Sequence, residues 1–136
     1  EIIECNQNNS DVITFHQYEG DKLESSIRRL KTLRRPVICT EYMARELGTT
    51  FEFSLPIFKD AKVGCYNWGL VAGKSQTHFG WTTVGNLQKL KKERCFLEEN
   101  EDIPEPDIWF HDIYRKDGSA YDDQEIECIK KILLDG

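Results

Sequence analysis

Short apolar runs alternate with helical patterns along the first half of the chain. Residues 12–18 and 63–68 are rich in β-branched and aromatic side chains, which predicts strands. Residues 37–42 form a nearly continuous apolar run, as expected for a strand that is buried on both faces. Between the strands, apolar residues recur at helical spacing: Leu23, Ile27, Leu30 and Leu33, and then Phe51, Leu55 and Phe58. Strands that alternate with helices predict an α/β fold with a parallel sheet.

Polar residues and prolines indicate where these two helices begin and end. We predict Asp21 as the N-cap of the first helix and either Thr49 or Thr50 as the N-cap of the second. The first helix should end at residues 34–36, because the residue before a proline disfavours helical geometry. Pro56 removes one hydrogen bond from the second helix, which predicts a kink or a later start.

The second half of the chain has a weaker pattern. Residues 69–118 form a long irregular stretch, and its charged segment at residues 89–101 is interpreted as a solvated loop or a short helix. In the helix that follows, Asp122 and Glu125 have the spacing of a capping box. The apolar stripe of this last helix consists of Ile126, Ile129, Ile132 and Leu133.

Composition and charge exclude several classes of function. The 136 residues are 39% hydrophobic and 31% charged, which is typical of one globular domain. A net charge of −6 argues against nucleic acid as a partner and favours a neutral or weakly charged substrate. No apolar run approaches the ~20 residues of a membrane span. Because the chain begins without methionine, we expect it to be a piece cut from a longer protein, although processing would look the same.

Cysteines, histidines and glycines do not form a metal or cofactor motif. The five cysteines include no Cys-x-x-Cys pair, and we interpret them as structural thiols rather than a disulfide framework or a metal site. His78, His111 and Asp112 lack the spacing of metal ligands. No glycine-rich phosphate-binding loop follows a predicted strand, so a nucleotide-binding fold is disfavoured. We therefore expect neither a metal nor a cofactor.

Groups that could contact a ligand stand where the predicted strands end. In parallel α/β sheets ligands bind at the carboxyl ends of the strands, because the strand-to-helix loops converge there. The alternation of side chains along a strand predicts three pairs, each on one face. These pairs are His16 with Tyr18, Cys39 with Glu41, and Tyr66 with Trp68, and we expect them to point toward one shared site.

Four segments carry a resemblance to a known family. They are DVITFHQY (residues 11–18), RPVICTEYMAR (35–45), VGCYNWGLVAGKSQT (63–77) and DIWFHDIYRKDGSAY (107–121). In this order they resemble the last part of (β/α)8-barrel retaining glycoside hydrolases. The closest similarity is to cellulase-like, xylanase-like and β-galactosidase-like proteins with a family-two or family-five type barrel. The resemblance implies that residues 1–136 are an incomplete domain, a partial barrel of about its last three strand–helix units.

The resemblance also implies roles for individual residues. Glu41 matches the catalytic nucleophile, which attacks the anomeric carbon while a second carboxyl group protonates the leaving oxygen. A tyrosine hydroxyl that donates to this nucleophile favours its ionised form, and Tyr18 is the candidate. The acid/base residue of the family ends strand four and has no counterpart here. The predicted sugar contacts are His16, Tyr18, Trp68, Gln76 and Trp81, the last two where this chain departs from the family's aromatic-Pro-Trp-Asp pattern.

We therefore expect the full-length protein to hydrolyse β-glycosidic bonds of oligo- or polysaccharides by double displacement. Its partners would be the carbohydrate substrate and the missing N-terminal part of the barrel, and this segment alone would be inactive. Two alternatives remain. One is a non-catalytic carbohydrate-binding or degenerate barrel protein, and the other is an unrelated open α/β module with helices on both faces of its sheet.

Overall fold

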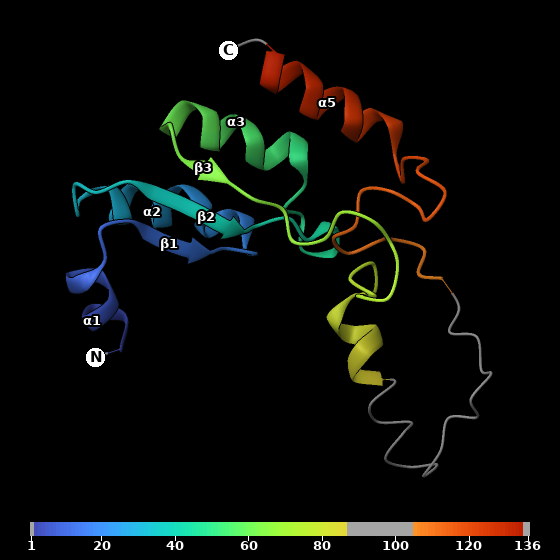
Figure 1. Ribbon diagram of the computed structural model, residues 1–136, viewed down its shortest axis with the longest axis horizontal. Coiled ribbons are helices and arrows are strands. Elements are labelled where there is room, and N and C mark those ends of the chain that lie inside the picture. The colour runs from blue at the N-terminus through green and yellow to red at the C-terminus, as the bar shows by residue number, and fades with distance from the viewer. Residues whose placement is uncertain (1, 87–104, 135–136) are drawn as a thin grey trace.

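A three-stranded parallel sheet forms the centre of the computed structural model, which describes residues 2–86 and 105–134 (Figure 1). The strands are β1 (Ile13–His16), β2 (Val37–Glu41) and β3 (Gly64–Cys65). The helices are α1 (Ile2–Asn9), α2 (Gly20–Lys31), the 3-10 helix η1 (Arg45–Leu47), α3 (Phe51–Ala61) and α5 (Asp123–Leu134), and residues 81–86 are also helical. The predicted α/β class with a parallel sheet is confirmed. The predicted charged segment at 89–101 lies outside the described residues.

Helices α2 and α3 both pack on one face of the sheet. The strand order β1-β2-β3 follows the chain, so both crossovers move in the same direction, and right-handed crossovers then place their helices on the same side. On the opposite face Thr14, Ile38 and Gly64 lie side by side in register, and Thr14 and Gly64 are exposed. The shared core contains Leu23, Ile27 and Leu30 of α2, Phe51 and Phe58 of α3, and Ile13, Val37 and Cys39 of the sheet.

The first helix follows the predicted apolar pattern but differs at both ends. Its N-cap is Glu19, whose side chain makes no capping hydrogen bond, so the prediction of Asp21 as cap is wrong. Asp21 lies in the first turn, where its negative charge faces the positive end of the helix dipole. The helix ends at Lys31, earlier than predicted, and Arg34 then adopts a left-handed conformation with φ of 55°.

Helix α3 begins at its predicted cap and runs through its proline. The Thr50 side chain accepts a hydrogen bond from the backbone N–H of Phe53, which confirms one of the two predicted caps. The helix is continuous across Pro56, so the expected later start is wrong. Pro56 stands in the middle of the helix, but the carbonyl that loses its donor belongs to Glu52, an exposed residue of the first turn, where water can bind it.

Two elements differ in length from the prediction. Strand β3 has only two residues instead of the six predicted at 63–68, because Asn67 leaves the sheet to hydrogen-bond the carbonyls of Gly69 and His111. Helix α1 was not predicted; it contains no buried residue, so no apolar stripe marks it. Arg35 donates to the carbonyls of Gln7 and Ser10, and these bonds hold the end of α1 beside β2.

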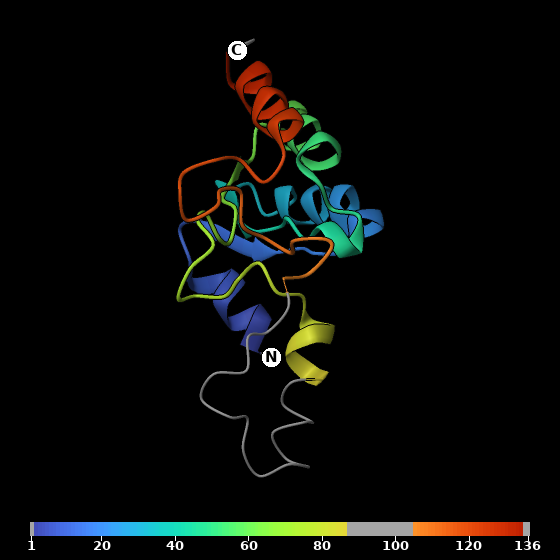
Figure 2. The same ribbon diagram turned by 90° about the vertical axis from the view of Figure 1, so that its right-hand side faces the viewer.

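The last helix, α5, packs against α3 and lies at the opposite end of the molecule from residues 81–86 (Figure 1 and Figure 2). The predicted cap is confirmed, because the Asp122 carboxylate accepts a hydrogen bond of 2.8 Å from the backbone N–H of Gln124. The predicted capping-box role of Glu125 is wrong: its carboxylate binds the guanidinium of Arg45 instead. Of the predicted stripe, Ile126 and Ile129 pack on the core, whereas Leu133 is largely exposed.

Candidate functional site

Glu41, at the carboxyl end of β2, is the centre of a hydrogen-bonded group. The Tyr18 hydroxyl donates to Glu41 Oε2 over 2.6 Å. His16 Nδ1 lies 3.3 Å from the same carboxylate oxygen. A backbone hydrogen bond of 3.0 Å from the N–H of Gln17 to the carbonyl of Glu41 fixes the two strand ends together. The structure thus brings together three of the predicted site residues at one end of the sheet.

A shift in strand register positions the Glu41 side chain. Phe15 pairs with Cys39, but the next residue, His16, pairs with Glu41, so Thr40 is an extra residue on β2. Cys39 and Tyr42 are both buried in the core, which strict alternation does not allow for residues three apart. The prediction that Cys39 and Glu41 share one face is therefore wrong. The irregularity turns Glu41 away from the core and toward Tyr18.

Tyr18 is a strong and permanent donor in this arrangement. Burial, and after it the hydrogen bond to Glu41, raises the pKa of Tyr18 well above its ordinary value of 10.0, so the phenol keeps its proton. Its ring is fixed from two sides. The Trp81 ring meets it edge to face with centroids 5.3 Å apart, and the His111 ring lies at 5.4 Å. Trp81, which is half exposed, thereby lies beside the group around Glu41, and its role as a sugar contact stays a prediction.

His111 is the residue of this site that sequence reasoning missed. It is only 4% exposed, and its Nδ1 lies 2.6 Å from the carbonyl oxygen of Met43. Because a carbonyl only accepts, Nδ1 carries the proton and Nε2 keeps its lone pair. Burial lowers the pKa of His111 below its ordinary value of 6.5, which favours this neutral form. The only available signal was local: His111 stands in the run Trp-Phe-His-Asp within an otherwise polar stretch.

Two predicted sugar contacts are not part of the hydrogen-bonded group around Glu41. Trp68 is 50% exposed, and Gln76 is exposed in a turn with a left-handed φ of 56°. Within residues 2–86 and 105–134, neither side chain hydrogen-bonds to or stacks on Glu41, His16 or Tyr18. The carboxyl ends of all three strands nevertheless point toward the loops that hold both residues (Figure 1).

The loop that holds His111 is fastened by buried polar contacts on either side of it. Both carboxylate oxygens of Asp112 lie 2.9 Å from the Thr77 hydroxyl. Gly69 has a φ of +99°, and a Cβ there would come within 2.7 Å of an Asp112 carboxylate oxygen. Only glycine fits this close approach, which sets His111 beside the loop after β3.

Arg45 links this loop to the nucleophile candidate and to α5. Its side chain is 5% exposed, and it donates to the carbonyls of Trp109 and Asp112 at 3.1 Å each. Its remaining donors meet Glu125, with Nε 2.7 Å from Oε1. Since Arg45 follows Glu41 by only four residues, the same segment holds the candidate nucleophile and the loop that packs on Tyr18.

Metal binding and membrane insertion have no structural support in the described residues. No group of three or more His, Cys, Asp or Glu side chains there is placed to hold a metal ion. Among the same residues, no helix is both long and apolar enough to cross a bilayer. The four described cysteines, Cys5, Cys39, Cys65 and Cys128, have free thiols, and Cys39 is buried as predicted.

Comparison of the chain with protein-family models, with curated proteins and with solved structures finds no match. The resemblance to glycoside hydrolases therefore stays a prediction from the residues, beside the geometry of the site.

Proposed function

We propose that this chain is the C-terminal part of a (β/α)8-barrel retaining glycoside hydrolase, with Glu41 as its nucleophile. One observation carries the proposal: at the carboxyl end of the middle strand, a carboxylate receives a hydrogen bond of 2.6 Å from a half-buried phenol and faces an imidazole at 3.3 Å. These two contacts orient a single carboxylate oxygen. They leave the other oxygen, Oε1, as the one that can attack a sugar.

The arrangement of the sheet supports the barrel. Its strands are parallel and ordered as in the chain, and both crossover helices lie on one face, as consecutive units of a (β/α)8 barrel require. In a closed barrel the free edge of β1 would pair with a preceding strand, and β3 would pair with the first strand. The face that carries Thr14, Ile38 and Gly64 would then line the barrel interior.

The proposed reaction has two displacements. In the first, Glu41 Oε1 forms a bond to the anomeric carbon, the glycosidic C–O bond breaks, and an acid from the upstream part of the barrel protonates the leaving oxygen. In the second, water gives a proton to the same upstream residue, now deprotonated, and attacks the anomeric carbon, and the bond to Glu41 Oε1 breaks to release the carboxylate. Tyr18 donates to the carboxylate when it is charged, and loses this favourable contact while the glycosyl ester exists, which favours release.

Mechanism-based labelling of the full-length protein tests this proposal. A panel of 2-deoxy-2-fluoro-β-glycosides with a good leaving group should leave one sugar attached to the peptide that contains Glu41, detected by mass spectrometry. E41Q should abolish the label, and E24Q, which changes an exposed carboxylate on α2, should keep it. Labelling on another carboxylate, with E41Q still active, would disprove the assignment. The 136-residue chain alone should not turn over an aryl β-glycoside, because it lacks the acid.

A non-catalytic carbohydrate-binding protein is the second candidate, favoured by the half-exposed indoles of Trp68 and Trp81. It predicts that the intact protein binds oligosaccharides but neither takes up the fluoro-sugar nor hydrolyses an aryl glycoside. The same labelling experiment, combined with a binding titration, therefore separates the two candidates.

A further inference from the structure

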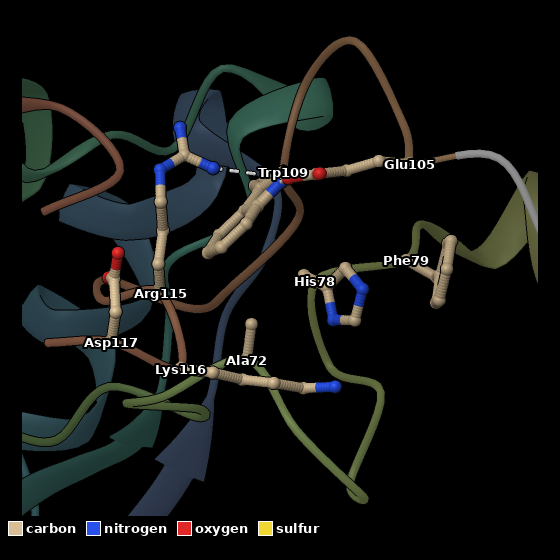
Figure 3. A pocket seen from close by; sticks show the side chains of 8 residues that line it. All are labelled: Ala72, His78, Phe79, Glu105, Trp109, Arg115, Lys116 and Asp117. Atoms are coloured by element: carbon tan, nitrogen blue, oxygen red, sulfur yellow. Dashed lines mark hydrogen bonds and ion pairs between the residues drawn. The ribbon is translucent and has the colours of Figure 1, made fainter. Parts of the chain in front are cut away.

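A pocket of about 430 Å³ opens between the two loops that follow the sheet (Figure 3). One loop contributes Ala72, His78 and Phe79, and the other contributes Trp109, Arg115 and Lys116. Glu105 and Asp117 complete its lining. None of these residues belongs to the group around Glu41, so the pocket is a separate candidate site.

The two acidic groups of the pocket already have protein partners. Glu105 Oε1 accepts hydrogen bonds from Trp109 Nε1 at 2.8 Å and from Arg115 Nη1 at 3.1 Å. Asp117 Oδ1 accepts from both the backbone N–H and the hydroxyl of Ser119. Figure 3 shows Arg115 on one side of Trp109, directed toward Glu105, so this guanidinium is committed to a protein partner as well.

The groups without a protein partner are potential donors. Lys116 forms no ion pair or hydrogen bond in the described part of the chain, and in Figure 3 its ammonium end lies on the same side of Trp109 as His78. His78 Nδ1 is buried without a hydrogen-bond partner and lies 3.7 Å from Asp112 Oδ2. Since Nδ1 faces the buried carboxylate, Nε2 on the far side of the ring is the nitrogen available to the pocket.

We propose that this pocket binds a compact oxyanion, a carboxylate or phosphate group, between Lys116 and His78. An oxyanion supplies the acceptors that both groups lack, and the apolar side chains of Ala72 and Phe79 reduce the screening of the resulting ion pair. Asp112 then lies on one side of the His78 ring and the bound anion on the other. The charged groups that face it are Asp112 and Lys116, with Arg115, Glu105 and Asp117 farther around the pocket. This site does not depend on the proposed hydrolase activity.

Calorimetric titration of the intact protein tests the site with three probes: inorganic phosphate, glucuronate, and glucose as the uncharged match of glucuronate. We expect phosphate, glucuronate or both to bind and glucose not to bind, and the two charged arms identify which oxyanion the pocket prefers. K116Q should weaken binding by about tenfold or more, because it removes a charge-assisted hydrogen bond. K130Q, which changes an exposed lysine on α5, should leave the affinity unchanged.

The role of His78 has a separate readout. H78Q replaces the ring nitrogen that faces the bound anion, so it should weaken glucuronate binding while glucose still fails to bind. The proposal is overturned if glucose binds as well as glucuronate, if neither oxyanion binds, or if K116Q retains full affinity. Because Lys116 is exposed, K116Q is expected to fold even if H78Q does not.

Discussion

The ion pair between Arg45 and Glu125 offers the sharpest test of how this fold is held together. The side chains are 5% and 8% exposed, and two hydrogen bonds of 2.7 and 2.5 Å join the guanidinium to the carboxylate. E125Q keeps the shape of the side chain but removes its charge, and its amide group turns a donor toward the guanidinium. The buried positive charge of Arg45 then keeps one amide oxygen in place of the carboxylate, the carbonyls of Trp109 and Asp112, and the ring of Tyr121, 4.5 Å away.

The magnitude follows from what is left uncompensated. Removing one partner of a buried ion pair costs about 3–5 kcal/mol, and the two carbonyls and the aromatic ring that remain favour the lower end, about 3 kcal/mol. The double variant R45M/E125L buries no charge, so it should cost less than the sum of the single changes. The coupling energy between the two positions should be about 2 kcal/mol or more.

Urea unfolding followed by far-UV circular dichroism measures these differences, provided that the slope of the transition is the same for all variants. The exposed pair Glu127–Lys130 on the same helix is the matched control, and E127Q should change the free energy of unfolding by less than about 1 kcal/mol. If E125Q is as stable as the parent chain within that margin, the buried pair does not hold α5 to the rest of the molecule, and the reasoning fails.

Three further predictions concern the site and the core. In the full-length protein, Y18F should lower kcat about ten- to a hundredfold in an aryl-glycoside assay, because it removes a hydrogen bond to the Glu41 carboxylate. An unchanged kcat would contradict the proposed role of Tyr18. Because the pKa of His111 is lowered in the folded chain, the unfolded chain binds a proton at His111 more readily. The stability that neutral His111 contributes is therefore present above pH ~6.5 and is lost as the pH falls through the folded-state pKa. The urea midpoints at pH 7.5 and 5.5 should therefore differ more for the parent chain than for H111N. Equal differences in the two chains would contradict this role of His111. Burial raises the pKa of Cys39 to about 12 and of Cys65 to about 11. At pH 8 iodoacetamide should therefore modify the exposed Cys5 before Cys39 and Cys65, as peptide mass spectrometry would show, and equal rates at the three cysteines would refute this order.

Local patterns predicted the features that depend on a few neighbouring residues. The apolar face of α2 was predicted because its buried residues recur every three or four positions, whatever they pack against. The Thr50 and Asp122 caps were predicted because a cap bonds a backbone group only two or three residues away. The meeting of Tyr18 and Glu41 was predicted because parallel neighbouring strands bring their carboxyl ends together.

Features that depend on distant partners could not be predicted in this way. Glu125 has the spacing of a capping box, but a buried guanidinium 80 positions earlier competes for its carboxylate, and the charged hydrogen bonds win. His111 reaches Tyr18 only because Gly69 and Asp112 bring two loops into contact. The extra residue Thr40 breaks the alternation on which the pairing of Cys39 with Glu41 relied.

Through the ion pair between Glu125 and Arg45, the last helix affects residues that it does not itself pack against. A stop codon after Asp122, or proteolysis there, removes the acceptor of Arg45 while leaving every residue around Glu41 intact. Without Glu125, the Arg45 guanidinium would turn toward solvent, and the turn that follows Glu41 would become less ordered. The His111 ring that packs on Tyr18 would then be less well positioned. Loss of the last helix is therefore expected to disturb the group around Glu41 through the single side chain of Arg45.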